Sequence, residues 1–341
     1  MKKTILFYTM TLNFGGAEKN ICALANHFVK NYNVILVSNI KSIIAYKLDS
    51  NIKIYQFDNN DSGLLKIKAK LSSKRTKELQ KIVKKDSVNL IIAFLPEPSI
   101  RALQIAQKMP IPVIIGIRNH PQYEFVGCKF LRDYYYQNAT YITIQHQAFA
   151  SFLPRKYHDK LVITPNVSPN CHQQGNKKNI ILNIGRLESP KNHKLLIESF
   201  KIFLEKHPDF KLHIYGEGTL KKDLNHLVSK FALQDKVFIF NNTQEVSKKI
   251  SESKLFVLSS KYEGMPNVVL ESLYLKTPVV STKSTPVMQD LILPKYISDF
   301  TPQDLALKMD SALKHYQFRP QPKLKDSFLV WEELINNIFY K

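Results

Sequence analysis

Residues 259–278 have the sequence SSKYEGMPNVVLESLYLKTP, and this stretch decides how the rest of the chain is interpreted. The apolar residues Leu255–Leu258 before it predict the end of a buried strand, and the apolar spacing over Asn267–Leu275 predicts a helix. Gly264 and Pro266 lie between the two, where the chain must bend sharply and enter the helix. The stretch therefore predicts a strand, a tight turn and a helix start in that order.

Two carboxylates bracket this predicted turn, Glu263 at its mouth and Glu271 inside the helix. Free N–H groups and a partial positive charge make a helix N-terminus a ready site for a phosphate. A carboxylate repels a phosphate, but it accepts hydrogen bonds from the hydroxyls of a ribose or a sugar ring. The stretch therefore predicts a pocket for a nucleotide diphosphate sugar. The alternative is an acidic helix start without a ligand, which the macrodipole stabilises by about 0.3–1 kcal/mol.

Length and composition predict two domains and an anionic partner. At about 150 residues per domain, 341 residues make two domains, and a hydrophobic fraction of 44% is ample for two cores. The formal net charge of +21 favours nucleic acid, phosphorylated substrates or an acidic membrane surface as partners. The three cysteines lie far apart, which predicts no disulfide framework or metal site and fits a reducing cytoplasm. The sequence contains no run of about 20 apolar residues, so we predict no membrane-spanning segment.

Apolar strands alternate with helical patterns in both halves of the chain, which predicts parallel sheets covered on both faces. Ligands of such sheets bind beyond the carboxyl ends of the strands. The predicted strands of the first half are Thr4–Met10, Asn33–Ser38, Ile52–Phe57, Leu90–Leu95, Val113–Ile117 and Tyr141–Ile144, followed by Leu161–Pro169, a strand that runs into a proline-bounded turn. Those of the second half are Asn179–Gly185, Lys211–Tyr215, Val237–Phe240, Leu255–Leu258 and Pro278–Ser281, with helices over Asn192–Lys206, Leu220–Phe231, Glu245–Ser253 and Asn267–Leu275.

The polar, lysine-rich segment Asn170–Lys178 separates the two series and marks the domain boundary. We predict a first Rossmann-like domain over residues 1–168, a second over 169–320, and a C-terminal segment over 321–341. The last segment carries apolar residues at helical spacing, namely Trp331, Leu334, Ile335 and Ile338.

Gly15 and Gly16 follow the first predicted strand and open a helix, so backbone N–H groups there can approach a diphosphate. The alternative is a tight turn without a ligand. No Gly-x-x-x-x-Gly-Lys or Gly-x-Gly-x-x-Gly motif is present, which disfavours an ATPase and a nicotinamide enzyme.

Further candidates lie just past other predicted strands. Arg186 and Lys191 place two cations near a strand end, where they can neutralise a departing diphosphate or simply be solvated. Gly216 belongs to the Tyr215-Gly216-Glu217-Gly218 turn, which shapes a pocket or is an ordinary left-handed turn. His120 follows Val113–Ile117 and is either a loop residue or a functional one.

Together these motifs resemble those of retaining glycosyltransferases of the GT-B fold, family 4, over nearly the whole chain. The resemblance rests on the paired acids Glu263 and Glu271 with seven residues between them, and on Gly-Gly-Ala-Glu at residues 15–18. It rests most specifically on Gly185-Arg186-Leu187 followed after a short gap by Lys191-Asn192. It implies two Rossmann-like domains facing across a cleft, with the C-terminal segment crossing back to brace the first domain.

The resemblance also implies roles for individual residues. Glu263 would face the donor sugar, Glu271 the ribose, and His120 the donor sugar or the acceptor. Arg186 and Lys191 would hold the donor phosphates and stabilise the leaving group. The remaining donor-site residues would be Gly15, Gly16, Gly216, Gly264, Asn267 and Val268.

The chain departs from the family pattern at one loop and lacks a metal-binding motif. Where relatives carry a glycine pair and then an acid, this chain has Lys283–Pro286, with Asp290 as the substitute acid, so the donor sugar cannot be deduced. Because no Asp-x-Asp occurs, we expect no metal ion and no cofactor beyond the nucleotide sugar.

A basic region over Lys66–Lys85 predicts a surface for anionic lipid, with apolar residues such as Leu79 and Ile82 interleaved. The alternative is a solvated helix face. The aromatic run Tyr134–Tyr136, with Phe125 and Phe130 before it, is predicted to line an acceptor cleft in the first domain.

We therefore expect an enzyme that moves a sugar from a UDP-sugar to a glycan on a polyprenyl diphosphate, in O-antigen, capsule or related synthesis. It would work in the cytoplasm, peripherally on the inner membrane. Three alternatives stay open: a nucleotide-sugar 2-epimerase of the same architecture, a nucleic-acid-binding protein, and an inactive partner subunit. The basic cluster sits in one domain and no recognition motif appears, so we expect no nucleic-acid partner.

Overall fold

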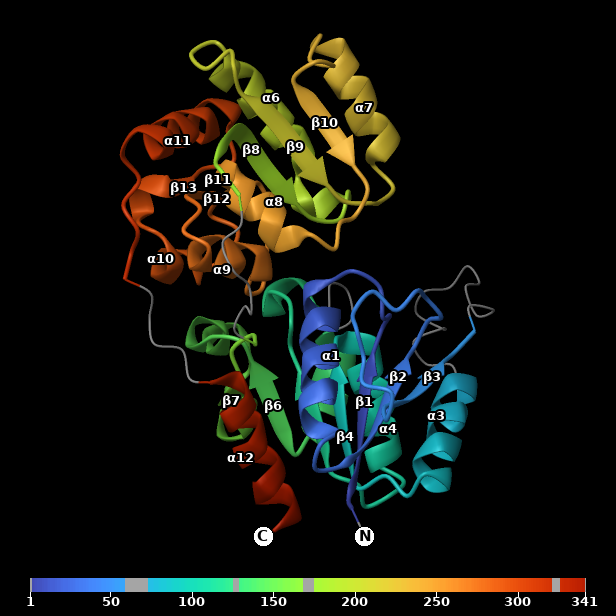
Figure 1. Ribbon diagram of the computed structural model, residues 1–341. Helices are drawn as coiled ribbons and strands as arrows, with labels where there is room; N and C mark the ends of the chain where they lie inside the picture. The colour runs from blue at the N-terminus through green and yellow to red at the C-terminus, as the bar shows by residue number, and fades with distance from the viewer. Residues whose placement is uncertain (1, 59–72, 125–128, 168–174, 321–325, 341) are drawn as a thin grey trace. The chain divides into compact units, whose positions relative to one another are not determined.

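The computed structural model describes residues 2–58, 73–124, 129–167, 175–320 and 326–340. The chain divides into two compact units, one made of residues 1–167 with 324–341 and the other of residues 168–323. Each unit is a parallel sheet flanked by helices (Figure 1). The predicted α/β class with two doubly wound parallel sheets is confirmed. Residues 66–72, Phe125 and residues 170–174, which entered the sequence predictions, lie outside the described residues.

The first unit contains a seven-stranded parallel sheet in the order β3-β2-β1-β4-β5-β6-β7. Its strands are β1 Thr4–Thr9, β2 Asn33–Ser38, β3 Lys53–Gln56, β4 Leu90–Phe94, β5 Val113–Gly116, β6 Tyr141–Ile144 and β7 Leu161–Ile163. Its helices are α1 Gly16–Phe28, α3 Ser73–Lys85, α4 Pro96–Ala106, α5 Lys129–Tyr136 and α12 Ser327–Phe339, with 3-10 turns η1 Pro121–Tyr123, η2 Gln147–Phe152 and η3 Arg155–Lys160.

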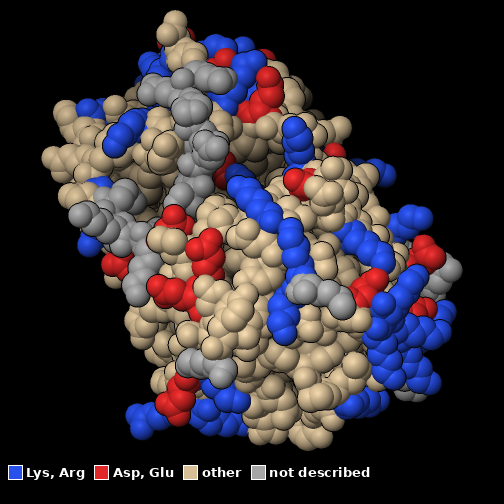
Figure 2. Space-filling model, turned by 60° about the horizontal axis from the view of Figure 1, so that its bottom comes forward, with Lys and Arg blue, Asp and Glu red and all other residues tan. Residues whose placement is uncertain are grey.

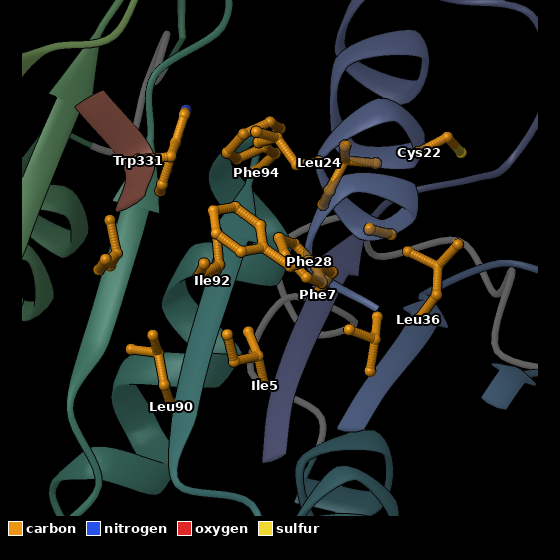
Figure 3. Close-up of a cluster of buried hydrophobic side chains, with 14 of the residues drawn as sticks. Ile5, Phe7, Cys22, Leu24, Phe28, Leu36, Leu90, Ile92, Phe94 and Trp331 are labelled. Atoms are coloured by element: carbon orange, nitrogen blue, oxygen red, sulfur yellow. The ribbon is translucent and has the colours of Figure 1, made fainter. Parts of the chain in front are cut away.

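The C-terminal helix α12 completes the core of the first unit. Trp331 is 1% exposed, and its ring centroid lies 5.9 Å from that of Phe94 at the end of β4. Figure 3 shows this pair with side chains of β1, α1 and β2, including Phe7, Phe28 and Leu36. The apolar spacing of the last segment thus buries its stripe against the first unit, as the resemblance implied.

The second unit contains a six-stranded parallel sheet in the order β10-β9-β8-β11-β12-β13. Its strands are β8 Lys178–Ile184, β9 Lys211–Tyr215, β10 Val237–Phe240, β11 Ser253–Leu258, β12 Val279–Thr282 and β13 Ile297–Ser298. Its helices are α6 His193–Leu204, α7 Lys221–Lys230, α8 Val246–Glu252, α9 Asn267–Tyr274, α10 Met288–Leu291 and α11 Pro302–His315, with 3-10 turns η4 Ser189–Lys191 and η5 Pro294–Tyr296.

Two α-helices and one strand between residues 282 and 316 were not predicted from the sequence. The helix α11 buries Leu305, Ala306, Met309 and Ala312, a stripe of partly small residues that gives a weak periodic signal. The helix α10 is four residues long and the strand β13 two, so neither offers enough residues for a pattern. The four helices that were predicted in the second unit agree with α6, α7, α8 and α9 to within two residues at each end.

Strand order reverses once in each sheet, between β1 and β4 in the first unit and between β8 and β11 in the second. Ligands of doubly wound sheets bind at such switch points, beyond the carboxyl ends of the strands. In the second unit the β8–β11 ladder runs to Leu182 opposite Phe256. One residue further, the side-chain amide of Asn183 donates to Val257 O at 2.7 Å. A side chain therefore bridges the two strands where they lead into the loops of the switch point.

Candidate functional site

The loops that follow β8 and β11 are held together at the switch point of the second unit. After β8 the chain passes through η4 and then Asn192, which has a left-handed φ of 51°. The amide of Lys261 donates to Pro190 O at 2.7 Å, and the Ser259 hydroxyl donates to Lys191 O at 2.9 Å. These bonds fix the position of Lys191 beside the start of the 259–278 stretch.

Lys191 and Glu263, predicted separately as phosphate and sugar ligands, form an ion pair. Lys191 Nζ lies 2.5 Å from Glu263 Oε1, and the Ser260 hydroxyl donates to the same oxygen at 2.6 Å. The Glu263 amide donates to Ser284 O at 2.9 Å, which ties this residue to the unusual 283–286 loop. The side chains are 23% and 11% exposed, so both still reach solvent. An ammonium has three donors, so Lys191 can bind a phosphate while it holds Glu263.

Arg186 lies on the same turn with an exposed side chain. Its neighbour Glu188 accepts hydrogen bonds from the Thr219 amide and the Thr219 hydroxyl, both at 2.9 Å. These two bonds, with a smaller contribution from the Arg186 charge, lower the pKa of Glu188. Arg186 lies two residues after β8 ends, and because its side chain is exposed, a ligand can reach the guanidinium from solvent.

Gly216 and Gly218 allow the turn after β9 to lie directly against the turn after β8. A Cβ on Gly216 would stand 2.0 Å from Gly185 O, and one on Gly218 would stand 2.4 Å from Leu187 O. The amide of Leu187 donates to Glu217 O at 2.8 Å across this contact. Gly216 therefore shapes the site through backbone packing.

The helix α9 supplies the second predicted acid. Pro266 precedes it in extended conformation, and Asn267 and Val268 are half-buried in its first turn. Glu271 is 4% exposed, and Gly264 is buried in the turn before the helix. The structure thus gives α9 the predicted helix start, with Glu271 one turn inside.

A histidine that the sequence analysis did not select braces the turn that carries Lys191. His193 begins α6, is buried, and its Nε2 lies 3.0 Å from Asn183 Oδ1. Since the Asn183 amide already donates to Val257 O, Nε2 carries the proton. Burial, with the nearby Lys191 charge, lowers the pKa of His193 to about 4, so the ring is neutral at pH 7. A histidine directly after the Lys-Asn pair was the available signal.

In the first unit, side chains of the protein already contact the predicted glycine loop at residues 15–16. The Gly15 amide donates to the Tyr46 hydroxyl at 3.0 Å, and that hydroxyl lies 3.0 Å from Gly15 O. A Cβ on Gly15 would stand 2.1 Å from Glu18 Oε2, so any larger residue there would require the Glu18 carboxylate to move. Gly16 is exposed at the start of α1. A diphosphate at Gly15 would compete with Tyr46 for the amide, and the predicted role of this loop stays a prediction.

His120 follows β5 and is 6% exposed, buried among aromatic rings. Its Nδ1 accepts a hydrogen bond from the Gln122 amide at 3.3 Å, and its ring lies 4.6 Å from that of Phe152. Burial lowers the pKa of His120, so the neutral ring carries its proton on Nε2. His120 can therefore donate from Nε2 to a ligand oxygen.

The aromatic run of α5 divides between core and surface. Tyr136 is 1% exposed, whereas Tyr134 is 55% and Phe130 72% exposed. Tyr134 and Phe130 can therefore contact a ligand or a surface without rearrangement, and Tyr135 is half-buried between Tyr134 and Tyr136.

In the part of the chain that the structure describes, no three His, Cys, Asp or Glu side chains gather as they would around a metal ion. Whether transfer needs a metal stays a prediction.

Comparison with known proteins shows which protein family the second unit matches. Residues 168–324 match the family of glycosyl transferases group 1. This part of the chain is a group 1 glycosyltransferase domain, and the protein is a transferase enzyme.

Two relatives and two solved structures are informative. The chain is 26% identical over 352 residues to a Campylobacter jejuni GalNAc-alpha-(1->4)-GalNAc-alpha-(1->3)-diNAcBac-PP-undecaprenol alpha-1,4-N-acetyl-D-galactosaminyltransferase, covering 98% of this chain and 92% of that protein. It is 30% identical over 257 residues to an uncharacterized glycosyltransferase of Methanocaldococcus jannaschii, covering 66% of this chain and only 63% of that protein. S. aureus TarM, solved with UDP, has a TM-score of 0.76 at 14% identity and covers 99% of this chain and 100% of its own. Pneumococcal GtfA, solved with UDP and GlcNAc, has a TM-score of 0.76 at 12% identity, with full coverage of both chains. The structural likeness shows the GT-B fold.

Proposed function

We propose that the protein transfers a sugar from a UDP-sugar to a glycan carried on a polyprenyl diphosphate, in the synthesis of a bacterial surface polysaccharide. The observation that carries this proposal is the Lys191–Glu263 pair, which lies at the β8/β11 switch point inside the group 1 domain. It offers a cation for a diphosphate and a carboxylate for sugar hydroxyls within one ion pair.

The donor would bind across the carboxyl end of the second sheet. Lys191 and the exposed Arg186 would hold the diphosphate, and the first-turn amides at Asn267 and Val268 would add donors from α9. Glu263 would face the sugar and Glu271 the ribose. UDP is the nucleotide present in the solved TarM and GtfA structures, which supports a UDP-sugar as donor.

We further propose the retaining mechanism of family 4. The bond between the sugar C1 and the diphosphate oxygen breaks, and a bond from C1 to the acceptor oxygen forms on the same face. The acceptor hydroxyl gives its proton to the departing diphosphate. Lys191 and Arg186 stabilise the negative charge that develops there, without a metal ion. His120 would donate to a ligand oxygen from Nε2.

The acceptor would bind to the first unit. The Campylobacter jejuni relative is named for an undecaprenyl-diphosphate-linked glycan, and a second one is named an N-acetylgalactosamine-N,N'-diacetylbacillosaminyl-diphospho-undecaprenol 4-alpha-N-acetylgalactosaminyltransferase, at 37% identity over 106 residues. These names support a lipid-linked acceptor. Such an acceptor lies in a bilayer, so the enzyme would work on the cytoplasmic face of the inner membrane.

The helix α3 would supply the attraction to anionic lipid. Figure 2 shows Lys and Arg side chains gathered at the right of the view, on the side where Figure 1 places α3. Its exposed cations are Lys74, Lys77, Lys81, Lys84 and Lys85. Leu79 and Ile82, the apolar residues interleaved with these lysines, are buried in the unit at 0% and 9% exposure, so they are not available to contact lipid. The attraction would therefore be electrostatic, at about 1 kcal/mol per lysine near the surface. Among the described residues, no helix has the length and apolar character needed to cross a bilayer.

A transfer assay tests the proposal. UDP-N-acetylhexosamines and UDP-hexoses would be offered with diphospho-undecaprenol-linked N-acetylgalactosaminyl-diacetylbacillosamine, and products analysed by mass spectrometry. We expect one UDP-sugar to be transferred, and Glu263→Gln to abolish most of that transfer while Glu245→Gln, on an exposed acid of the same unit, leaves it intact. No transfer with any donor would refute the proposal, and a converted nucleotide sugar in the absence of acceptor would identify an epimerase instead.

A further inference from the structure

The start of α4 lies at the switch point of the first unit, between β1 and β4, and its position is fixed by an unusual backbone. Leu95, which joins β4 to α4, has φ 74° and ψ 158°, a region that is essentially restricted to glycine. Its amide donates to Gly116 O at 3.2 Å, and its carbonyl accepts from the Ser99 amide at 3.1 Å and the Ser99 hydroxyl at 2.7 Å. These bonds hold Glu97, two residues later, at the carboxyl end of the sheet.

The two carboxylate oxygens of Glu97 have different surroundings. Oε1 accepts from Asn39 Nδ2 at 3.0 Å, from Arg101 Nη2 at 2.8 Å and from Arg101 Nε at 3.3 Å. Oε2 accepts no hydrogen bond from the residues that the structure describes, and the side chain is 16% exposed. One oxygen is thus fixed in place while the other is presented to solvent.

A buried polar network behind Oε1 keeps the carboxylate in this orientation. The Tyr8 hydroxyl donates to Asn39 Oδ1 at 2.6 Å, so the Asn39 amide nitrogen is turned toward Glu97. The Arg101 side chain is 1% exposed and reaches the Thr76 hydroxyl through Nη1 at 3.4 Å. The buried Arg101 guanidinium and the Asn39 amide therefore fix the position of Oε1 from two sides.

We propose that Glu97 Oε2 accepts a hydrogen bond from a hydroxyl of the acceptor glycan, which makes the β1/β4 switch point an acceptor-sugar subsite. This inference rests on the proposed function. A carboxylate oxygen repels a phosphate and accepts from a hydroxyl, so the ligand group here is a neutral sugar hydroxyl and not the carrier diphosphate. The carboxylate of Glu18, after β1, stands against its own glycine loop.

The substitution Glu97→Gln tests the role of Oε2 separately from that of Oε1. The glutamine carbonyl can take the place of Oε1 and keep the bonds from Asn39 and Arg101, while its NH₂ replaces the accepting Oε2 with a donor. With the undecaprenyl-linked acceptor named above, we expect the acceptor KM to rise roughly 10- to 100-fold. We expect the donor KM, and the slow hydrolysis of the UDP-sugar without acceptor, to stay within about twofold of the parent. Glu333→Gln, which removes an exposed charge from α12 of the same unit, should change none of these values.

The outcomes distinguish this subsite from the proposed function. If the parent enzyme transfers the sugar but Glu97→Gln keeps an acceptor KM within twofold, the subsite is wrong and the function stands. If the parent transfers nothing, the function fails and the subsite with it. If Glu97→Gln does not fold, Glu97→Asp takes its place in the experiment, because it keeps a negative charge near Arg101 but withdraws it by one methylene. An unchanged acceptor KM in that variant overturns the subsite, and a raised one with an unchanged donor KM supports it.

Discussion

The two switch points of this protein share a topology and differ in the groups they present. At β8/β11 the turns carry glycines, the exposed Arg186, and Lys191 paired with Glu263. At β1/β4 the presented group is the carboxylate of Glu97, whose cation Arg101 is buried behind it. The second unit therefore offers cations to solvent, and the first offers a fixed hydrogen-bond acceptor. The comparison teaches that the same sheet edge can present a cation or a carboxylate oxygen to solvent, according to which partner of an ion pair is exposed.

The largest effect should follow from removing the presented cation of the second unit. We expect Lys191→Met to lower kcat by about 100- to 1,000-fold, since it removes a charge that would stabilise the leaving diphosphate. Steady-state kinetics with the UDP-sugar identified in the transfer assay would measure this. Lys230→Met, on the exposed surface of α7, is the control. A kcat within threefold of the parent would mean that Lys191 serves only to hold Glu263.

The next effect concerns backbone packing between the turns of the second unit. Gly216→Ala forces a Cβ to within 2.0 Å of Gly185 O, so we expect the free energy of unfolding to fall by about 1–3 kcal/mol and the affinity for UDP to fall with it. Urea unfolding and calorimetric titration with UDP would measure both. Gly185→Ala is the matched control, because its Cβ would meet Lys191 Cδ at an ordinary 3.5 Å. Equal losses in the two variants would contradict this account of Gly216.

Part of the fold and part of the candidate site could be predicted from the sequence alone. The apolar strands and the Gly-Arg-Leu and Lys-Asn motifs predicted the sheets and the residues at β8/β11, because both depend on local spacing. The Lys191–Glu263 contact depends on how two loops 72 residues apart are joined, which no local pattern encodes. Glu97 was missed in part for the same reason: Arg101 is its i,i+4 neighbour on α4, but Asn39, which orients the same oxygen, lies just past β2, 58 residues away. The spacing of Leu79 and Ile82 among the lysines identifies an apolar stripe, but not that the core of the unit covers it.

A smaller effect should appear in the pH dependence of stability. The pKa of His193 is lowered to about 4 in the folded protein, so the unfolded chain binds an extra proton between that pH and about 6.5. Stability therefore falls as the pH drops through this window, by about 2 kcal/mol between pH 6.5 and pH 5. Urea unfolding at pH 7 and pH 5 should show a smaller loss for His193→Gln than for the parent. His226→Gln, on an exposed histidine of α7, should behave as the parent does.

The smallest effect concerns the lysines of α3. We expect Lys81→Gln to weaken binding to vesicles with anionic phosphatidylglycerol by about fivefold, since each lysine contributes about 1 kcal/mol near such a surface. Sedimentation with vesicles at low salt would measure it. Lys230→Gln is the control, and vesicles without anionic lipid should bind neither protein. Identical binding of the two variants would remove α3 from the lipid surface.

The helix α12 makes the second unit, in terms of chain connectivity, an insertion within the first. Trp331 enters the core beside Phe94 only after the intervening 168–323 unit has been synthesised. During synthesis the second unit can therefore fold completely while the first still exposes the apolar surface that α12 will cover. We therefore expect a protein cut short before residue 327 to carry a folded second unit attached to a first unit whose apolar surface stays uncovered and promotes aggregation.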